Sequence, residues 1–500
     1  MKIQKAVAFL ILFFLAFDGY SQTAFTPKCK KAYTTIAALE FKKAEEILNA
    51  EKYVNPDNQV IVFLEDYIDF LKVFISEKAT LYEKALDKRD KRLDKIDQLP
   101  EENPFKKYLK GEIYLHWASI KGKMGDRFSA AVDLNKAYRL LKENHEQFPE
   151  FVPGYAGLGV IEVLIGTIPE KYGWLANLLN LEGTVEGGRQ RIQHLLSLSQ
   201  GEDSWAFLEY PTLFMLSFIE LNTGHKIEPA ILQRYKSYHR KGTLRYQPLL
   251  VFAYANLLQK ERKNELTLQV LNSYEKSHEE YPFYYLDYMK GLAYLFKNSE
   301  KCLYYFDDYI DKFPGRHYIK SAYQKKAWYY LINGDTVRYR YHISFAAEEG
   351  YAYIGADKHA ENEAVNETIP NVALLKARLF FDGGYYEKAM KSLNFFTTKE
   401  QTQEEVTEFY YRKGRILHET GKLDSALDFY TKAYHRGKDL ETYHAANAAL
   451  MSGKIYEQKN LDESALKQYD KALNLKGFEY QLSIHQKAEA GKSRIEERHQ

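Results

Sequence analysis

One pattern of small and aromatic residues occurs twice near the C-terminus of this chain, with the same spacing each time. The first copy is Gly414, Ala426, Tyr430 and Ala433, and the second copy is Gly453, Ala465, Tyr469 and Ala472. Small residues at fixed intervals let two helices cross closely, and an aromatic residue nearby fills the space beside the crossing. Because one helical hairpin cannot bury its own apolar face, the pattern predicts a stack of hairpins.

This spacing resembles the tetratricopeptide repeat, a helix-turn-helix unit of about 34 residues. The match is specific over residues 370–475, where Ala377, Phe380, Gly384 and Ala389 add a partial copy. It is weak before about residue 280. The resemblance implies an all-α fold, a tetratricopeptide-repeat α-solenoid in which hairpins stack into a right-handed superhelix with a concave binding groove. Since the matching positions are packing residues, the resemblance carries no catalytic residue with it.

Weaker copies of the pattern extend toward the N-terminus. They contain the pairs Gly291 and Phe306, Ala327 and Tyr330, and Gly111 and Ala130. In one of these units, bulky Tyr339 stands where a small residue is expected, so either its second helix packs less closely or the register differs. We therefore predict degenerate helical repeats over residues 22–200 and a tetratricopeptide-repeat solenoid over residues 201–500. The best candidate for the break is Gln200–Ser204.

The first residues have the pattern of an export signal. Lys2 and Lys5 precede an apolar run over residues 6–17, and small residues precede a cleavage site before Gln22. The run is shorter than the roughly 20 residues that span a bilayer, which makes an uncleaved anchor the lesser alternative. We expect residues 1–21 to be a signal peptide and the protein to be exported to a bacterial periplasm. Association with the outer membrane is left open.

The chain has two cysteines, Cys29 and Cys302. An exported protein is able to join them in a disulfide. Cys302, however, falls at a small position of a predicted second helix, where a thiol packs as a small apolar residue. We therefore favour free thiols and keep the disulfide as the alternative. Thr26, Pro27 and Lys28 precede Cys29, which is unlike the context of a lipidated cysteine.

Charge and aromatic content bear on the class of partner. The chain has 70 Lys and Arg residues against 68 Asp and Glu residues, interspersed along its length, which argues against nucleic acid as a partner. Its 42 tyrosines and 29 phenylalanines exceed what the repeat positions use. Half-buried rings with solvated hydroxyls explain them most simply. The alternative is an aromatic platform for peptide or sugar, with clusters such as residues 281–285 and 328–330.

A row of cations is the sharpest functional signal. The residue after the small position of the first helix is Arg378, Arg415 and Lys454 in the three clearest repeats. In the tetratricopeptide family this position faces the groove, so the resemblance implies three stacked cations. Tyr411 and His418 lie one turn to either side of Arg415. Because an arginine fork suits carboxylates, we predict that these five residues bind an acidic segment or a C-terminal carboxylate.

The alternative is that these cations are solvated side chains paired with nearby acids, as most surface charges are. The acids that the spacing offers are Asp382, Glu419 and Glu457. The carboxylate clamp of chaperone-binding relatives also needs asparagines at particular groove positions, and this arrangement is not found in the sequence. Its specificity is therefore not transferred to this chain.

After Gly166 the chain departs from the repeat. Trp174, Leu175, Leu178 and Leu179 share one face of a predicted helix. A membrane-surface helix usually has a strongly charged opposite face, and this helix is nearly uncharged. We expect the apolar face to pack into the solenoid, with membrane or partner docking as the alternative.

No enzymatic motif accompanies the repeats. His435 and His444 are too far apart for a metal pair one helical turn apart, and the sequence has no His-Glu-x-x-His, no phosphate-binding loop and no nucleophile elbow. We expect no enzyme activity, no metal and no cofactor. The leading hypothesis is a periplasmic scaffold that binds an extended segment of another envelope protein in its groove, without a transmembrane segment after signal removal. The alternative is a glycan- or nutrient-binding protein that uses groove aromatics.

Overall fold

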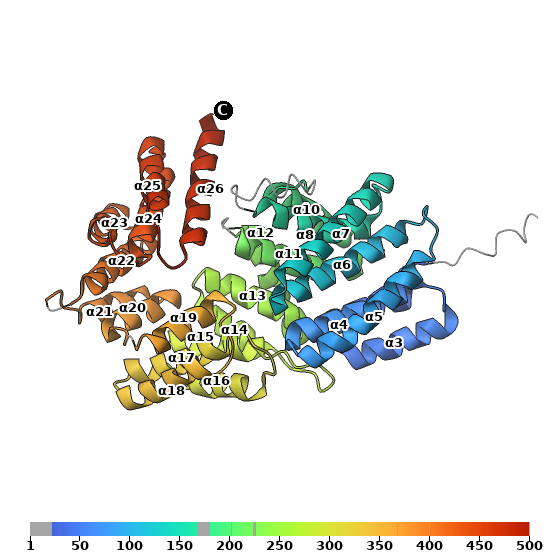
Figure 1. The fold of residues 1–500 in the computed structure, drawn as a ribbon, viewed down its shortest axis with the longest axis horizontal. Helices are drawn as coiled ribbons and strands as arrows, with labels where there is room; N and C mark the ends of the chain where they lie inside the picture. Colours follow the sequence, from blue (N-terminus) through green and yellow to red (C-terminus); the bar gives the residue numbers. More distant parts are fainter. Residues whose placement is uncertain are drawn as a thin grey trace, which may run out of the picture. The chain divides into compact units, whose positions relative to one another are not determined.

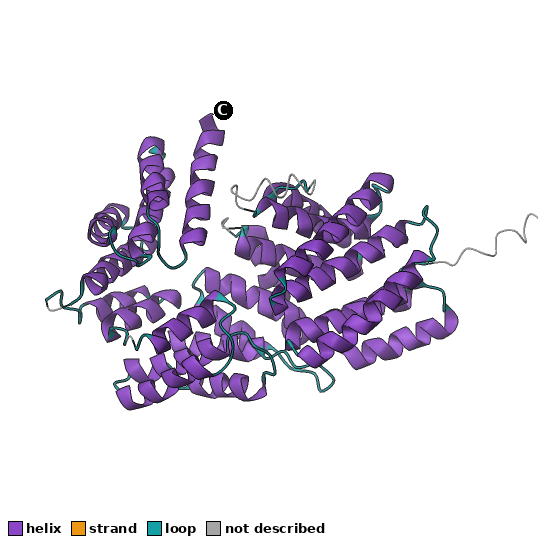
Figure 2. Ribbon diagram, in the orientation of Figure 1, coloured by secondary structure: helices purple, strands orange, loops and turns teal. Residues whose placement is uncertain are grey.

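The chain folds into helices joined by loops (Figure 1). The computed structural model describes residues 23–168, 181–201, 203–223, 227–367, 369–399 and 401–499, and no strand occurs among them (Figure 2). The predicted all-α fold is therefore confirmed. None of the described helices is long and apolar enough to cross a membrane. The predicted signal peptide and the predicted face around Trp174 lie outside the described residues.

The described residues form two compact units. Unit 1 contains the residues up to Ile219 together with Arg240–Leu250 and Glu275–Phe283, and unit 2 contains Glu220–His239, Val251–Tyr274 and the residues from Tyr284 onward. Three helices are divided between the units: α11 (Glu209–Asn222), α12 (Pro229–Arg240) and α13 (Pro248–Lys260). The domain boundary near residue 200 stays a prediction, and residues 203–219 lie with unit 1.

Unit 1 is built from helices that pack in consecutive pairs. They are α2 (Pro27–Ala37) with α3 (Phe41–Val54), α4 (Gln59–Ser76) with α5 (Ala79–Asp97), α6 (Pro104–Met124) with α7 (Arg127–Gln147), and α8 (Tyr155–Gly166) with α10 (Val185–Gly201). A side-chain oxygen caps the start of several of them. Asn58 accepts a hydrogen bond from the Val60 amide, and Asn103 accepts one from the Phe105 amide next to Pro104.

Unit 2 continues the same organisation (Figure 1, yellow to red). After α14 (Asn264–Ser273), its pairs are α15 (Tyr285–Phe296) with α16 (Lys301–Lys312), α17 (Ile319–Ile332) with α18 (Thr336–Glu348), α20 (Val372–Asp382) with α21 (Tyr386–Leu393), α22 (Gln403–Glu419) with α23 (Leu423–Gly437), and α24 (His444–Gln458) with α25 (Asp462–Asn474). Besides α14 and the divided helices, α19 (Gly355–Val365) and the final α26 (Gln481–His499) also stand outside the pairs. First helices of successive pairs also contact one another, as α20, α22 and α24 do, and α24 contacts α26.

The repeated glycines lie where the two helices of a pair cross. A Cβ atom on Gly414 would lie 2.7 Å from the Tyr430 ring, and one on Gly453 would lie 2.5 Å from the Tyr469 ring. The alanines of both copies are fully buried, like these two tyrosines. The packing role predicted for the pattern is therefore confirmed, because only glycine lets the partner ring approach so closely.

Tyr339 corrects one detail of the prediction. It is buried although it takes the place of a small residue, and its hydroxyl donates a hydrogen bond to Glu363 Oε1 at 3.0 Å. Glu363 belongs to α19, which packs on α18 and which the repeat pattern does not foresee. The additional helix gives the large ring a place to pack and a polar partner, so the helix that carries Tyr339 is not loosely packed.

Both cysteines are buried free thiols. Cys29 lies on α2 in unit 1, and Cys302 lies on α16 in unit 2. Burial raises the pKa of each thiol, which keeps both in the protonated, poorly nucleophilic form. This agrees with the favoured prediction that Cys302 is a small core residue.

Candidate functional site

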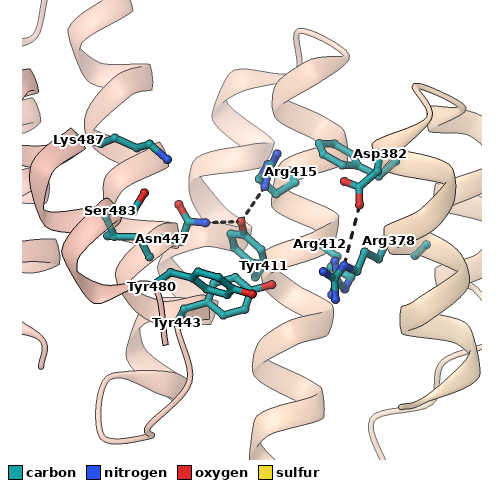
Figure 3. A pocket seen from close by; sticks show the side chains of 13 residues that line it. Arg378, Asp382, Tyr411, Arg412, Arg415, Tyr443, Asn447, Tyr480, Ser483 and Lys487 are labelled. Carbon is teal, nitrogen blue, oxygen red and sulfur yellow. Dashed lines mark hydrogen bonds and ion pairs between the residues drawn. The ribbon is translucent and has the colours of Figure 1, made fainter. Parts of the chain in front are cut away.

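A cavity of about 300 Å³ lies in unit 2 on the face formed by α20, α22, α24 and α26 (Figure 3). Its polar lining consists of four cations, one carboxylate, three tyrosines, one amide and one hydroxyl: Arg378, Arg412, Arg415, Lys487, Asp382, Tyr411, Tyr443, Tyr480, Asn447 and Ser483. Three of these helices are the first helices of their pairs. The cavity therefore has an excess of positive charge, and it includes the predicted residues Arg378, Arg415 and Tyr411.

Arg415 is held in the cavity by aromatic rings and a phenol. Its guanidinium lies 4.5 Å from the centre of the Phe381 ring and 5.7 Å from that of Tyr411. Its Nη1 donates a hydrogen bond to the Tyr411 hydroxyl at 2.7 Å. Within the described part of the chain, no carboxylate forms an ion pair with Arg415. This geometry fixes the direction of the guanidinium group, and Asp382 acts on its charge without forming an ion pair with it.

The Tyr411 hydroxyl is the centre of the polar network. It accepts hydrogen bonds from Arg415 Nη1 and from Asn447 Nδ2, both at 2.7 Å (Figure 3). Both partners are donors, so the phenolic hydrogen itself finds no acceptor among the described residues. Because Tyr411 is only 2% exposed, this buried donor is available to an acceptor atom inside the cavity.

Two of the four arginine and lysine side chains in the lining are partly neutralised. Arg378 Nε lies 3.9 Å from Asp382 Oδ2, and its guanidinium stacks over the Trp328 ring at 4.9 Å. Arg412 pairs with Glu408 on the same helix. The alternative of paired charges therefore holds for Arg378.

The same alternative is wrong for Arg415 and Lys454. Glu419 pairs with Arg262 at 2.9 Å, and Glu457 pairs with Arg494 at 2.9 Å, so both acids are bound by other arginines. Lys454 has no ion pair or hydrogen bond in the described ranges. The tertiary fold thus removes the nearest counter-charges from two of the three predicted cations.

We use the term cation triad for Arg415, Lys454 and Lys487. Burial together with Lys487, Arg494 and Arg415 lowers the pKa of Lys454 to about 8. Desolvation and Arg415 also lower the pKa of Lys487, which likewise has no ion pair or hydrogen bond in this part of the structure. Two lysines whose pKa values are lowered by burial and by neighbouring cations, and which form no ion pair of their own in the described chain, favour an incoming anion. Lys454 is not one of the residues that line the cavity, and its charge acts on the cavity through Arg415 and Lys487.

His418, the fifth predicted residue, faces a different neighbour. Its Nδ1 lies 3.3 Å from the Tyr430 hydroxyl on the second helix of its own pair. Burial lowers its pKa, so the imidazole is neutral at neutral pH. It is not part of the cavity lining, and its contact with Tyr430 joins the two helices of the pair.

Several lining residues were missed by the sequence analysis. Tyr480, Ser483 and Lys487 lie on or just before α26, which has no copy of the repeat pattern. Asn447 lies three residues after His444, the first residue of α24, and only the observed hydrogen bond to Tyr411 identifies its role. A search for polar residues at the groove-facing turn of each first helix would have found Asn447, but no sequence signal points to α26.

The aromatic residues divide between core and surface. Trp328, Phe283 and Tyr285 from the two predicted clusters are buried, which agrees with packing. Tyr443 and Tyr480 meet edge to face in the cavity wall, with ring centres 5.5 Å apart. In the described residues no group of His, Cys, Asp and Glu side chains is arranged to hold a metal ion.

No protein-family model matches this chain, and a comparison with curated proteins finds no match. The interpretation of the cavity therefore rests on its own geometry.

Proposed function

We propose that this protein is a non-enzymatic scaffold whose cavity in unit 2 binds an acidic stretch of an extended protein or peptide segment. The observation that supports this most is the cation triad, three like charges on three neighbouring helices without a carboxylate partner in the described chain. Bringing an anion to them relieves mutual repulsion and adds charge-assisted hydrogen bonds. The free Tyr411 donor adds a further hydrogen bond for a carboxylate oxygen.

The proposed setting follows from the sequence. We propose that the chain is an exported member of the tetratricopeptide-repeat superfamily, with residues 1–21 as signal peptide and another envelope protein as partner. The helical pairs and their Gly–Tyr crossings support a repeat of this kind. A cavity of about 300 Å³ accommodates one or two side chains, so the rest of a bound segment would lie along the first helices.

Neutralising the two lysines of the cation triad tests their role in peptide binding and their effect on stability in one variant. The double variant Lys454→Gln and Lys487→Gln should bind a short peptide of alternating Glu and Ala at least about tenfold more weakly than the wild type. Its melting temperature should be unchanged or higher, because the substitutions remove repulsion. Fluorescence anisotropy with the labelled peptide measures the first effect, and circular dichroism measures the second.

The matched control is Lys492→Gln, which removes one lysine that is paired with Asp470 instead. It should leave peptide affinity unchanged. A peptide with Gln in place of Glu should not bind. If the Gln peptide binds as well as the Glu peptide, or if the double variant retains full affinity, the acidic-segment proposal is wrong.

Peptide binding should also depend on pH. Below pH 8 Lys454, whose pKa is about 8, is charged, whereas above pH 8 it becomes neutral. Affinity for the acidic peptide should therefore fall as pH rises through about 8, at constant ionic strength. The free energy of unfolding of the unliganded protein changes in the opposite direction. Because the folded state disfavours the charged Lys454 ammonium group, the unliganded protein becomes more stable as this group loses its proton at higher pH. Lys454→Gln should flatten the binding curve in this range, and an equally steep curve in that variant would contradict the assignment.

A glycan or nutrient ligand is the second candidate. The perpendicular rings of Tyr443 and Tyr480 in the cavity wall favour it, since aromatic faces and edges also bind sugars. A saccharide array tests it directly. Binding of a sugar that survives Lys454→Gln with Lys487→Gln but is lost in Tyr443→Ala would replace the acidic segment as the ligand.

A further inference from the structure

Three tyrosines and one glutamate come together in the core of unit 1. Tyr33 lies on α2, Tyr67 on α4, and Tyr108 and Glu112 on α6. All four side chains are buried, with residue exposures between 3% and 9%. The arrangement is independent of the cavity in unit 2 and of the function proposed for it.

The polar atoms of these four residues form few hydrogen bonds within the described chain. None of the three hydroxyls forms a hydrogen bond with another residue in the described chain. Glu112 has one, as Oε1 accepts from the Gly157 amide at 3.1 Å, and no cation pairs with it. None of these hydroxyl oxygens is among the fully enclosed side-chain atoms without a partner, so each borders space that a small polar group can reach.

Other buried tyrosines of the same unit show the normal situation. The Tyr138 hydroxyl donates to the Glu182 carbonyl at 2.9 Å, and the Tyr155 hydroxyl donates to the Pro149 carbonyl at 2.6 Å. The lack of partners is therefore specific to the group around Glu112 and does not reflect how this fold treats tyrosine.

The polar atoms of the four residues influence one another without forming hydrogen bonds. Burial raises the pKa of Tyr33, Tyr67 and Tyr108, and the nearby Glu112 carboxyl raises each of them further. No hydrogen bond joins any two of these four side chains, so their polar atoms lie farther apart than directly bonded partners do. Such a spacing fits a small polar group placed among them.

Aromatic rings enclose the group on several sides. Tyr33 and Tyr67 have ring centres 5.4 Å apart, and the Phe63 ring lies 6.0 Å from that of Tyr108. Phe207, which follows α10, packs edge to face on Tyr33 at 5.5 Å. Aromatic faces stabilise cations and apolar groups but do not bind anions.

Several charged groups on the surrounding helices are already paired, and Lys30 of α2 lies over the Phe207 ring, 5.6 Å from its centre. Asp66 of α4 lies 3.3 Å from Arg92 of α5 and 3.1 Å from His116 of α6. On α7, Asp133 pairs with Arg89 and with Lys121. On α8, Glu162 pairs with Arg191 of α10. Glu112, by contrast, forms no ion pair with a described residue.

We propose that Tyr33, Tyr67, Tyr108 and Glu112 form a binding site for a small organic ammonium ion. The ammonium would form an ion pair with Glu112 and donate hydrogen bonds to the phenol oxygens, while its carbon chain lies against the aromatic rings. A neutral polyol would satisfy the hydroxyls and leave the carboxyl group protonated. An anion would gain no charge partner from this carboxyl group and would be repelled by the ring faces.

This assignment predicts that binding releases a proton. Burial raises the pKa of Glu112 to about 8, against which the Gly157 hydrogen bond acts, so the free carboxyl group is protonated at neutral pH. The bound ammonium favours the carboxylate, and the balanced step converts the carboxylic acid and the ammonium ion into a carboxylate–ammonium pair and one free proton. At about pH 9 the carboxyl group is already ionised and this release should disappear.

Isothermal titration calorimetry with butylammonium chloride tests the proposal. Titrations of the purified protein at pH 7 in phosphate and in HEPES buffer should differ in heat by the equivalent of about one proton. Butylammonium should bind at least about tenfold more tightly than 1-butanol or butyrate. Equal binding of 1-butanol, no detectable binding of butylammonium, or no proton release at pH 7 would each overturn the proposal.

Variants locate the site. Glu112→Gln keeps the acceptor for the Gly157 amide and removes the ionisable group, so butylammonium affinity should fall at least about tenfold and proton release should vanish. Tyr67→Phe removes one phenol oxygen and should weaken butylammonium binding severalfold. This variant tests the site independently if Glu112→Gln does not fold. Tyr138→Phe is the control, because its hydroxyl already has a partner, and it should bind butylammonium like the wild type. Unchanged affinity in Tyr67→Phe and Glu112→Gln would show that the probe binds elsewhere.

Discussion

Replacing Tyr469 by alanine is expected to lower the free energy of unfolding of the C-terminal helices by about 3–5 kcal/mol, the range for removing a large buried ring. The ring is fully buried between two helices of unit 2. A Cβ atom on Gly453 of α24, or on Gly491 of α26, would lie 2.5 Å from it. Because both glycines leave room only for this ring, its removal creates a cavity that the rigid backbones around it fill poorly.

Two further variants separate the parts of this effect. The Tyr469 hydroxyl donates to Glu457 Oε2 at 2.5 Å, so Tyr469→Phe should cost about 1.5–3 kcal/mol, typical of a hydrogen bond to a charged group. Gly491→Val should also be destabilising because its side chain would overlap the ring. Tyr304→Ala is the control, since this tyrosine is 65% exposed.

Hydrogen exchange of α24, α25 and α26 is the appropriate measurement, because the units of a chain of this length do not necessarily unfold together. Protection in these helices should fall in Tyr469→Ala and stay at the wild-type level in Tyr304→Ala. Equal protection in both variants would mean that the ring does not hold α26 against the last pair.

The sequence could predict the packing of the repeats because that packing is local. A glycine in one helix and a tyrosine in the next are separated by a short, fixed stretch of chain, as Gly453 and Tyr469 are. Their contact follows from helix geometry alone. The same locality placed Arg378, Arg415 and Tyr411 on one face of the first helices, where the cavity includes them.

Charge pairing could not be predicted in the same way. Glu457 is one turn from Lys454 on the same helix, which favours an ion pair between them. In the structure Arg494 of α26 takes the carboxylate with two hydrogen bonds, at 3.0 and 2.9 Å. A bidentate arginine outcompetes a single lysine, and the choice depends on where the final helix packs. The uncompensated charge of Lys454 is therefore a tertiary property.

The group around Glu112 shows the same limit. Tyr33, Tyr67 and Tyr108 come from three helices of the part of the chain where the repeat pattern is weak. Each is unremarkable in a sequence with 42 tyrosines. Their hydroxyls become informative only when the fold shows which buried phenols have partners and which have none.

The second large effect is expected in unit 1, where Asp66→Ala should lower the free energy of unfolding by about 3–5 kcal/mol, the range for breaking a buried ion pair. Asp66 is 1% exposed and receives three contacts: Arg92 Nη1 at 3.3 Å, Trp117 Nε1 at 3.3 Å and His116 Nδ1 at 3.1 Å. Alanine would leave the indole and the imidazole without their acceptor and would remove one of the two carboxylates that hold the guanidinium. Denaturation followed by tryptophan fluorescence measures the loss.

The stability lost in Asp66→Ala should come mainly from the partner groups that it leaves without a counter-charge, and less from the loss of the attraction itself. A double variant distinguishes these two contributions. In Asp66→Leu with Arg92→Met, both charges are replaced by apolar side chains, so much of the stability lost in Asp66→Ala should return. Asp69 keeps Lys88 as a partner at 3.1 Å and does not become unpaired. Asp90→Ala is the control, since its side chain is 74% exposed and should cost no more than about 1 kcal/mol. A double variant as unstable as Asp66→Ala would mean that His116 and Trp117, and not the charge of Arg92, dominate the need for Asp66.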